Sequence, residues 1–439
     1  DRPRTRLRPA EYSDREAAAS HRVIPMTNRA IMPTSQRPAF TMSNQQLHID
    51  IAIIGGGIAG LWTLNQLRGL GYSAVLFEEE ALGSHQTIAS QGMIHGGIKY
   101  ALGGTWSGGS EAISAMPDAW RACLKGEGTV DLRGCRVLSE DFYLWSGGGL
   151  QSKMSSFLAS KMLRGRVEKL SASDYPAPLR DPAFRGQVYR LVDLVMDMPS
   201  VVATLVERQR DAIFHIDWHS ARLLRDGCKA RLSLPGVDVI PQRLLLTAGT
   251  GNEGLIRQLG GAGPEMQRRP LQQVIVKHQY REPFYAHCTG SNPSPRLTVS
   301  SHRTSRDEPV WYLGGDLATE STDDTPEQLI DKAQRELGEL LPWIDFGEMH
   351  WRTVQLDRAE PKQSALLRPD RAFVGRVDSV DNALAAWPTK LSLSPDLGNE
   401  VQRLLDSDGI RPGTPVELAP LEHLGRPGLA PTCWDALFL

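Results

Sequence analysis

The first candidate for a chemical role along the chain is a glycine-rich turn whose backbone could bind a phosphate group. Gly55, Gly57 and Gly60 satisfy the spacing G-x-G-x-x-G. In such a turn the first glycine allows the sharp bend, the second lets the backbone approach a pyrophosphate, and the third lets a helix pack closely on a strand. Backbone amides at the start of that helix, near Ile58 and Ala59, would then face the phosphates. The turn therefore predicts a dinucleotide site.

The elements needed to hold this turn follow in the right order. Residues 48–54 predict a short, buried, β-branched strand before it, and apolar residues at helical spacing run from Ala59 to Leu70 after it. Residues 74–77 predict a second strand that ends at Glu78, about 20 residues after the turn. A carboxylate there accepts hydrogen bonds from an adenosine ribose and disfavours a 2′-phosphate. We therefore predict FAD or NAD rather than NADP.

A long loop decides between the two cofactors. After Glu78 the chain continues with a Gly-, Ser- and His-rich stretch, residues 84–100, where an NAD dehydrogenase would add another βα unit. Its segment His95–Tyr100 resembles the His-Gly-Gly-hydrophobic-basic-Tyr segment beside the flavin ring in FAD-dependent glycerol-3-phosphate dehydrogenases and their relatives in the D-amino-acid oxidase superfamily. Ile94–Tyr100 is also similar to a run in L-2-hydroxyglutarate dehydrogenases. The resemblance implies FAD as cofactor, with contacts from Thr87, Ser90, Gln91 and Gly92.

Two later stretches resemble the same superfamily. Arg243–Gly251 predicts a buried strand that runs into a Thr-Ala-Gly turn, similar to the second dinucleotide-domain turn, and implies cofactor contacts from Ala248 and Gly249. An ordinary strand that ends in a glycine turn would give the same pattern. Trp387–Asn399 is similar to the last flavin-contacting segment, in which a helix N-terminus points at the pyrimidine edge of the ring.

In that late segment the implied contacts are Thr389, Lys390 and Leu391. A helix N-terminus together with Lys390 would stabilise negative charge on the reduced flavin. Pro388 and Thr389 replace glycines of the resembled family, which leaves the backbone contact open. The alternative for Lys390 is an ordinary solvated lysine.

The whole pattern predicts an α/β protein with an α+β cap. We expect a Rossmann-like FAD-binding domain into which a substrate domain, built on an antiparallel sheet, is inserted. Apolar patterning predicts a helix at 194–206, an amphipathic helix at 327–341, and cap strands within 273–313. The expected FAD-binding pieces are 48–105, 190–262 and 355–425, and the substrate pieces are 106–189 and 263–354.

Both ends of the chain are expected to lie outside these domains. Residues 1–47 are rich in arginine and have no apolar segment, so we expect a disordered tail or a start assigned too far upstream. Residues 426–439 are expected to form a C-terminal tail.

Histidines are the natural candidates for the proton-accepting group, because imidazole titrates near neutral pH. His95 is the first candidate, since the resemblance places it nearest the flavin. It also suits a hydrogen bond to the flavin, a covalent flavin link, or a structural role in the glycine loop. His302 and His278 are rival bases from the cap, although each also suits an ordinary strand or loop position.

Cationic and aromatic side chains are candidates for binding the substrate. Substrates in the resembled families are often anionic, so an arginine with two-pronged geometry is expected over the ring. Arg303 is the preferred clamp and Arg358 the second. Lys277 is a candidate for assisting oxygen, and Trp311 and Tyr312 suit either a pocket wall or core packing.

Composition limits the class of protein. The chain has 439 residues, 41% hydrophobic and 23% charged, with a net charge of −2, which excludes a disordered chain and a nucleic-acid footprint over the whole protein. Five scattered cysteines, none in a CxxC pair, disfavour a disulfide framework and a zinc site, so we predict no metal and a reducing compartment. No apolar run reaches the length of a bilayer. We expect a cytoplasmic protein without a transmembrane segment.

These features predict an enzyme, an FAD-dependent dehydrogenase or oxidase. We expect it to oxidise a small polar CH–OH substrate, such as a hydroxy acid or polyol phosphate, by hydride transfer to flavin N5. The alternatives are an amine or amino-acid oxidase on the same scaffold, and a non-catalytic flavin-bound interaction protein. The expected electron acceptor is oxygen, a quinone or another carrier, and a quinone would bring the protein to a membrane surface.

Overall fold

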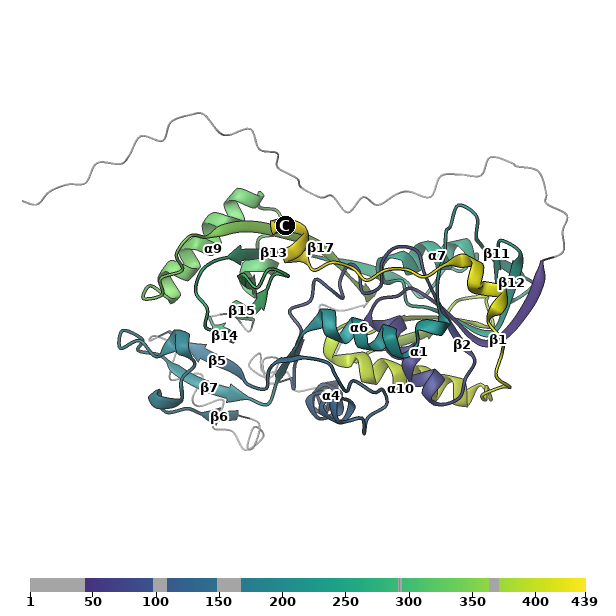
Figure 1. Ribbon diagram of the computed structural model, residues 1–439, viewed down its shortest axis with the longest axis horizontal. Helices are drawn as coiled ribbons and strands as arrows, with labels where there is room; N and C mark the ends of the chain where they lie inside the picture. The colour runs from purple at the N-terminus through teal and green to yellow at the C-terminus, as the bar shows by residue number, and fades with distance from the viewer. Residues whose placement is uncertain (1–43, 98–108, 148–166, 291, 293, 363–370) are drawn as a thin grey trace, which may run out of the picture. The chain divides into compact units, whose positions relative to one another are not determined.

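An eight-stranded sheet carries the predicted dinucleotide turn (Figure 1). The computed structural model describes residues 44–97, 109–147, 167–290, 292, 294–362 and 371–439. The parallel strands of this sheet have the order β19, β12, β1, β2, β9, and β18, β10 and β11 add antiparallel edges. The bounds are β1 Gln45–Ile54, β2 Ala74–Glu78, β9 Ile213–His215, β10 Arg222–Asp226, β11 Lys229–Leu234, β12 Val237–Leu246, β18 Phe373–Arg376 and β19 Ala383–Trp387.

Apolar residues of β1 alternate between the two faces of this sheet. Ile51 and Ile53 belong to a core cluster on one face that includes residues of α1, α6 and α10, whereas Ala52 and Ile54 join a second cluster that includes Leu255 of α7 on the other. Burial on both faces explains why the strand reads as an unbroken apolar run. The helices concerned are α1 Ile58–Gly69, α6 Met198–Arg208, α10 Ser394–Ser407 and α7 Asn252–Gln258.

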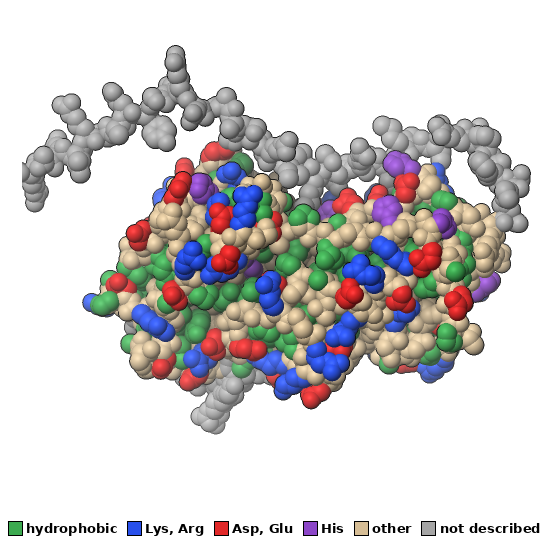
Figure 2. Space-filling view, viewed as in Figure 1, with side chains coloured by type: hydrophobic (Ala, Val, Ile, Leu, Met, Phe, Trp, Pro, Cys, Tyr) green, Lys and Arg blue, Asp and Glu red, His purple; other side chains and the backbone are tan. Residues whose placement is uncertain are grey.

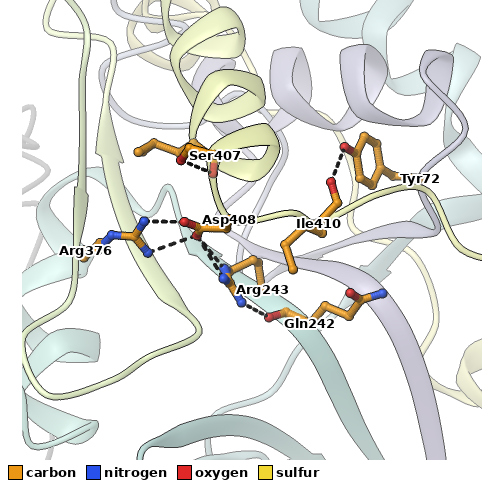
Figure 3. A network of polar contacts seen from close by, with 8 residues as sticks. Tyr72, Gln242, Arg243, Arg376, Ser407, Asp408 and Ile410 are labelled. Carbon is orange, nitrogen blue, oxygen red and sulfur yellow. Dashed lines mark hydrogen bonds and ion pairs between the residues drawn. The ribbon is translucent and has the colours of Figure 1, made fainter.

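One carboxylate fixes the C-terminal end of α10 to this sheet (Figure 3). Asp408, whose side chain is 9% exposed, pairs with Arg243 of β12 at 2.9 Å and with Arg376 of β18. The hydrogen bond from Arg376 is the main cause that lowers the pKa of Asp408 to about 2. Nearby, the Tyr72 hydroxyl donates to the Ile410 carbonyl at 3.1 Å. These contacts hold the helix that follows the predicted late flavin segment.

A second eight-stranded sheet corresponds to the expected substrate domain. Its order is β17, β13, β16, β15, β14, β5, β7, β6, and all neighbours are antiparallel except β14 and β5. Two short helices, α3 Gly109–Ser114 and α4 Met116–Lys125, and the small sheet β3–β8–β4 lie in the same part of the sequence as β5–β7. The bounds are β3 Met93–Ile94, β4 Val137–Ser139, β5 Phe142–Ser146, β6 Val167–Lys169, β7 Gln187–Leu191, β8 Leu194–Met196, β13 Met266–Lys277, β14 Tyr285–Thr289, β15 Pro295–Arg303, β16 Pro309–Gly314 and β17 His350–Pro361.

The two faces of the substrate sheet differ in chemistry. One face is apolar: Leu297 of β15 and Trp311 of β16 pack against α9, Pro326–Leu340, which is the expected amphipathic helix. The residues that alternate with them point to the opposite face and are largely polar, because side chains of a strand alternate between faces. Ser300, His302 and Tyr312 are examples, all buried.

Several expected boundaries are corrected. The helix expected at 194–206 begins at Met198, because Asp197 caps it by accepting the Ser200 amide, and residues 194–196 form β8. The first strand begins at Gln45 rather than 48. Strand β17 crosses the expected domain boundary at 354–355. The division into domains otherwise stays a prediction.

The segment 426–439, expected as a tail, is folded onto both sheets. Leu82, in the loop after β2, donates its amide to the Gly428 carbonyl and accepts from the Ala430 amide. Helix α11, Cys433–Phe438, then places Trp434 against His302 of the substrate sheet, with ring centroids 4.3 Å apart. The end of the chain therefore contacts both halves of the fold.

One face of the molecule carries side chains of both charges. On the face drawn in Figure 2, Lys and Arg side chains are interspersed with Asp and Glu. Within the described ranges, no helix has the length and apolar character required to cross a bilayer. The same residues contain no cluster of three or more potential metal ligands.

Candidate functional site

The turn formed by Gly55, Gly57 and Gly60, here called the glycine cradle, is too tightly packed to accept larger side chains. Gly55 has φ of 112°, which favours glycine, and a Cβ there would lie 2.7 Å from the backbone of Ala248. A Cβ on Gly60 would lie 2.0 Å from the Gly55 carbonyl oxygen. The close packing of strand, turn and helix therefore requires both glycines. Gly57, the N-cap of α1, has extended backbone, and a Cβ there would lie 3.2 Å from the Thr87 hydroxyl oxygen.

Polar groups converge on the start of α1. The first turn of the helix contains no acidic residue, and its first amides have no partner within the helix. The Ile58 amide donates to the Thr87 hydroxyl at 3.0 Å, and the Gly56 amide donates to the Glu78 carboxylate at 2.5 Å. An ionised carboxylate has about four acceptor positions, so Glu78 retains capacity for a ribose hydroxyl.

The second predicted turn lies directly beside the first. The Thr247 hydroxyl is 3.0 Å from the Gly55 carbonyl, and the Ala248 amide donates to Asn252 at 2.7 Å. Gly249, with φ of 57°, accepts a 3.0 Å hydrogen bond from the indole of Trp387. Strands far apart in sequence are thereby joined around the glycine turn.

The late segment contacts the loop that carries His95. Ser392, in the 3₁₀ turn Leu391–Leu393, accepts the His95 amide at 2.9 Å through its hydroxyl. Lys390 caps that turn, and Thr389 has φ of 62°. Leu391 packs partly buried in the core beneath α1 and α10. Two stretches predicted to meet at the flavin are therefore in contact.

The loop before His95 also reaches the substrate sheet. Gln91 donates to the Tyr312 carbonyl at 2.8 Å and to the Ser300 hydroxyl at 3.2 Å. A Cβ on Gly92, whose φ is 73°, would lie 2.1 Å from the Met196 carbonyl oxygen. The Ser90 hydroxyl is buried and has no hydrogen-bond partner among the described residues. A buried unpartnered hydroxyl in this loop marks a place for a polar ligand.

His95 forms a dyad with a carboxylate that the sequence did not reveal. Its Nδ1 is 3.0 Å from Asp193 Oδ2, and the side chains are 13% and 3% exposed. The other Asp193 oxygen accepts the Gly96 amide at 2.8 Å. A carboxylate on Nδ1 orients the ring and makes Nε2 the proton-accepting nitrogen. Lys99 and Tyr100 of the resembled segment lie outside the described residues.

A second histidine missed by the sequence analysis lies against this dyad. The ring of His287, on β14, stacks on His95 with centroids 5.4 Å apart and an interplanar angle of 27°. Its Nδ1 is 2.8 Å from the Thr298 hydroxyl. The signal available in the sequence was the alternation Tyr285-Ala-His-Cys, in which small apolar residues mark the core-facing positions.

The two rival histidines are placed elsewhere. His302 is enclosed by Trp434 and bonded to Ser300, and burial lowers its pKa to about 3. His278 lies among aromatic rings on the α9 face, beside Trp311, and burial lowers its pKa to about 4. Neither imidazole therefore titrates near neutral pH, as a general base should.

Three of the predicted cationic residues lie on strands of the substrate sheet. Arg303 is exposed and donates to the carbonyl and carboxylate of Asp307, an i,i+4 pair. Lys277 pairs with Glu308 at 2.9 Å. Arg358 lies half-buried on β17, where it pairs across the sheet with residue 269 of β13. The clamp roles of Arg303 and Arg358 stay predictions.

Comparison with known proteins identifies the family. The family model described as "FAD dependent oxidoreductase" (DAO) matches residues 50–382. The chain belongs to the DAO family. A relative from Pseudomonas aeruginosa, "Probable FAD-dependent oxidoreductase PA4991", is 48% identical over 396 residues, which cover 90% of this chain and 99% of the relative. The crystal structure of PA4991 matches with a TM-score of 0.78 at 43% identity, covering 90% of this chain and 100% of that one.

More distant matches agree with this assignment. Glycine oxidase from Geobacillus kaustophilus has the same fold, with a TM-score of 0.59 at 15% identity over 85% of this chain and 98% of that structure. A glycerol-3-phosphate dehydrogenase from Pseudomonas tolaasii is 45% identical over 51 residues, which are 12% of this chain and 10% of that protein. The predicted superfamily, fold class and enzyme class are thereby confirmed.

FAD, the cofactor of the DAO family, suits the residues present. The glycine cradle and the start of α1, which has no acidic residue in its first turn, suit a pyrophosphate. The buried Ser90 hydroxyl, which has no partner among the described residues, could form a hydrogen bond to the cofactor. Glu78 would hold the adenosine ribose. The late segment around Lys390 and the loop around Gln91 would hold the flavin end. No described residue of the cradle blocks this assignment.

Proposed function

We propose that this DAO-family oxidoreductase oxidises a small polar CH–OH substrate, such as a hydroxy acid or polyol phosphate. The observation that supports it is the His95–Asp193 dyad, held at the loop that contacts both the late segment and the substrate sheet. Bound FAD supplies the two-electron oxidising chemistry. The chain itself must bind the substrate, orient its C–H bond and accept the hydroxyl proton.

His95 is suited to the proton step. An alcohol is a weak acid, so its oxidation benefits from a positioned base. Asp193 holds the proton of neutral His95 on Nδ1 and would stabilise the imidazolium formed when Nε2 accepts a proton. The Asp193 side chain is buried and that of His95 is 13% exposed, so little of the dyad is open to water that would compete for the substrate hydroxyl.

Oxidation of an amine or amino acid is the second candidate. The name of the fold neighbour from Geobacillus, glycine oxidase, supports it, as the name of the Pseudomonas tolaasii relative supports the first. A neutral amine needs no base to assist its oxidation, so this reaction would not require the His95–Asp193 pair as proton acceptor. We accordingly favour the CH–OH substrate.

The electron acceptor is proposed to be oxygen, a quinone or another carrier. All five cysteines carry free thiols, which supports a reducing compartment such as the cytoplasm. A quinone acceptor would add contact with a membrane surface.

An anaerobic substrate panel tests the proposal. Purified holoprotein is mixed with alcohols, hydroxy acids, polyol phosphates, amines and amino acids, and flavin absorbance is followed. We expect bleaching by members of the first three groups. Bleaching by amines alone, with a rate that rises as the amine deprotonates, would favour the second candidate instead.

A further inference from the structure

Strand β14 presents its histidine to the flavin loop rather than to the core. Ala286 and Cys288 point into the apolar cluster beneath α9. Tyr285 joins the cluster on the opposite face, together with Met93 of the loop that leads to His95. His287 has the same parity as Tyr285 and therefore lies on that opposite face.

His287 is held in one orientation there. It is 1% exposed, its Nδ1 contacts the Thr298 hydroxyl at 2.8 Å, and the edge of Phe142 packs against its ring with centroids 4.6 Å apart. Its stacking on His95 brings together one imidazole from the flavin loop and one from the substrate sheet. Each imidazole has its Nδ1 fixed by a partner on its own side, Asp193 or Thr298.

We propose that His287 is a specificity-determining residue, which binds a polar atom on the carbon next to the one that is oxidised. The inference rests on the proposed function of His95 as proton acceptor. Two ordered imidazoles side by side suit a substrate with oxygen atoms on neighbouring carbons, one for each ring. Neutral imidazole both donates and accepts hydrogen bonds, so the second atom is a hydroxyl or a carboxylate oxygen.

His278, another buried histidine, next to the end of β13 in the substrate sheet, is an example of a histidine that serves core packing. His278 lies on the α9 face, where its ring packs edge-on with those of Trp311 and Phe346. His287 has a polar anchor, and the ring on which it stacks belongs to the proposed base. His278 therefore provides a matched control for a substitution at His287.

Binding of unreactive ligand pairs tests the proposal without turnover. α-Hydroxyisobutyrate is compared with tert-butanol, and pinacol with its monohydroxy analogue. Each reference ligand keeps the tertiary hydroxyl for His95 and lacks the second polar group, and no ligand has a hydrogen on its hydroxyl-bearing carbon. Dissociation constants are measured with holoprotein by calorimetry and by perturbation of flavin absorbance. In at least one pair the ligand with two polar groups should bind about tenfold more tightly, the effect of one hydrogen bond in a buried site.

Three variants give the decisive comparison. H287F keeps an aromatic ring and should reduce the ratio of affinities to about one, whereas H278F should leave it unchanged. H287N, whose amide can keep the contact with Thr298, should also lose the preference and serves if H287F does not fold. A ratio that survives in both His287 variants, or a wild-type protein without any preference, would overturn the proposal. Failure of the proposed function is seen separately, as bleaching by amines alone in the substrate panel.

Discussion

Replacing Asp193 with asparagine should move the proton of neutral His95 from Nδ1 to Nε2. The carboxylate accepts hydrogen bonds at Oδ2 from His95 Nδ1 and at Oδ1 from the Gly96 amide. Asparagine offers one acceptor oxygen and one NH₂ donor. Because the Gly96 amide can only donate, the oxygen stays with it and the NH₂ faces Nδ1. The imidazole must then accept at Nδ1 and carry its proton on Nε2, where it can no longer act as a base.

The size of the effect follows from the contact that is lost. A hydrogen bond to a charged group contributes about 1.5–3 kcal/mol. If Asp193 stabilises the imidazolium only in the transition state, its loss slows substrate oxidation roughly 10- to 100-fold. The change of tautomer adds to this factor. Flavin content is measured alongside, and the rate constants are compared at equal flavin content.

Two measurements check this prediction. Anaerobic stopped-flow absorbance gives the rate constant of flavin reduction with the best substrate of the panel, and nitrogen-15 NMR of the imidazole reports the tautomer of His95. D131N is the matched control, since Asp131 is also an ion-paired carboxylate but pairs with Arg133 and Arg208. Wild-type rate and tautomer in D193N would refute the assigned role of the dyad.

Other substitutions test the cofactor site and the fold. G60A should abolish FAD binding, measured as flavin per protein after reconstitution, because its Cβ would lie 2.0 Å from a carbonyl oxygen. G69A in the same helix has open space around the new Cβ and should retain FAD. Full flavin content in G60A would contradict the role of the glycine turn in binding FAD. W434A should lower the free energy of unfolding by about 3–5 kcal/mol in denaturant titrations, because a buried indole is removed. L439A, at an exposed position, should change the free energy of unfolding little. Equal effects of the two substitutions would contradict the packing of α11 on the substrate sheet. The pKa of Asp408 is depressed from 3.8 to about 2, so its ion pairs stabilise the fold above about pH 4 and that stability is lost as the pH falls toward 2. D408N should therefore cost about 1–2 kcal/mol at neutral pH and nothing near pH 2, and a cost independent of pH would contradict the ion-pair assignment.

Local signals explain what the sequence could predict. The glycine turn, its flanking strands and Glu78 are specified by neighbours in sequence, and the structure forms them as expected. The expected helix at 194–206 wrongly includes residues 194–196, which form β8, although the Asp197-Met-Pro turn lies inside that range. The Asp197-Met-Pro start signal marks the true boundary, since an N-cap followed by proline begins a helix.

Long-range contacts explain what it could not. Asp193 and His287 acquire their roles only because tertiary packing brings them to His95. His302 was a reasonable candidate base on its strand, yet it is enclosed by Trp434 from a segment expected to be a tail. Such contacts leave no periodic signal in the sequence.

Flavin reduction in a His95 variant tests the central claim most directly. Wild-type and H95Q holoproteins are mixed anaerobically with the substrate that bleaches the wild type fastest, and their rate constants are compared at equal flavin content. Loss of a general base should slow reduction by a factor of roughly 10²–10⁴ in H95Q. Reduction of H95Q at the wild-type rate would contradict the account.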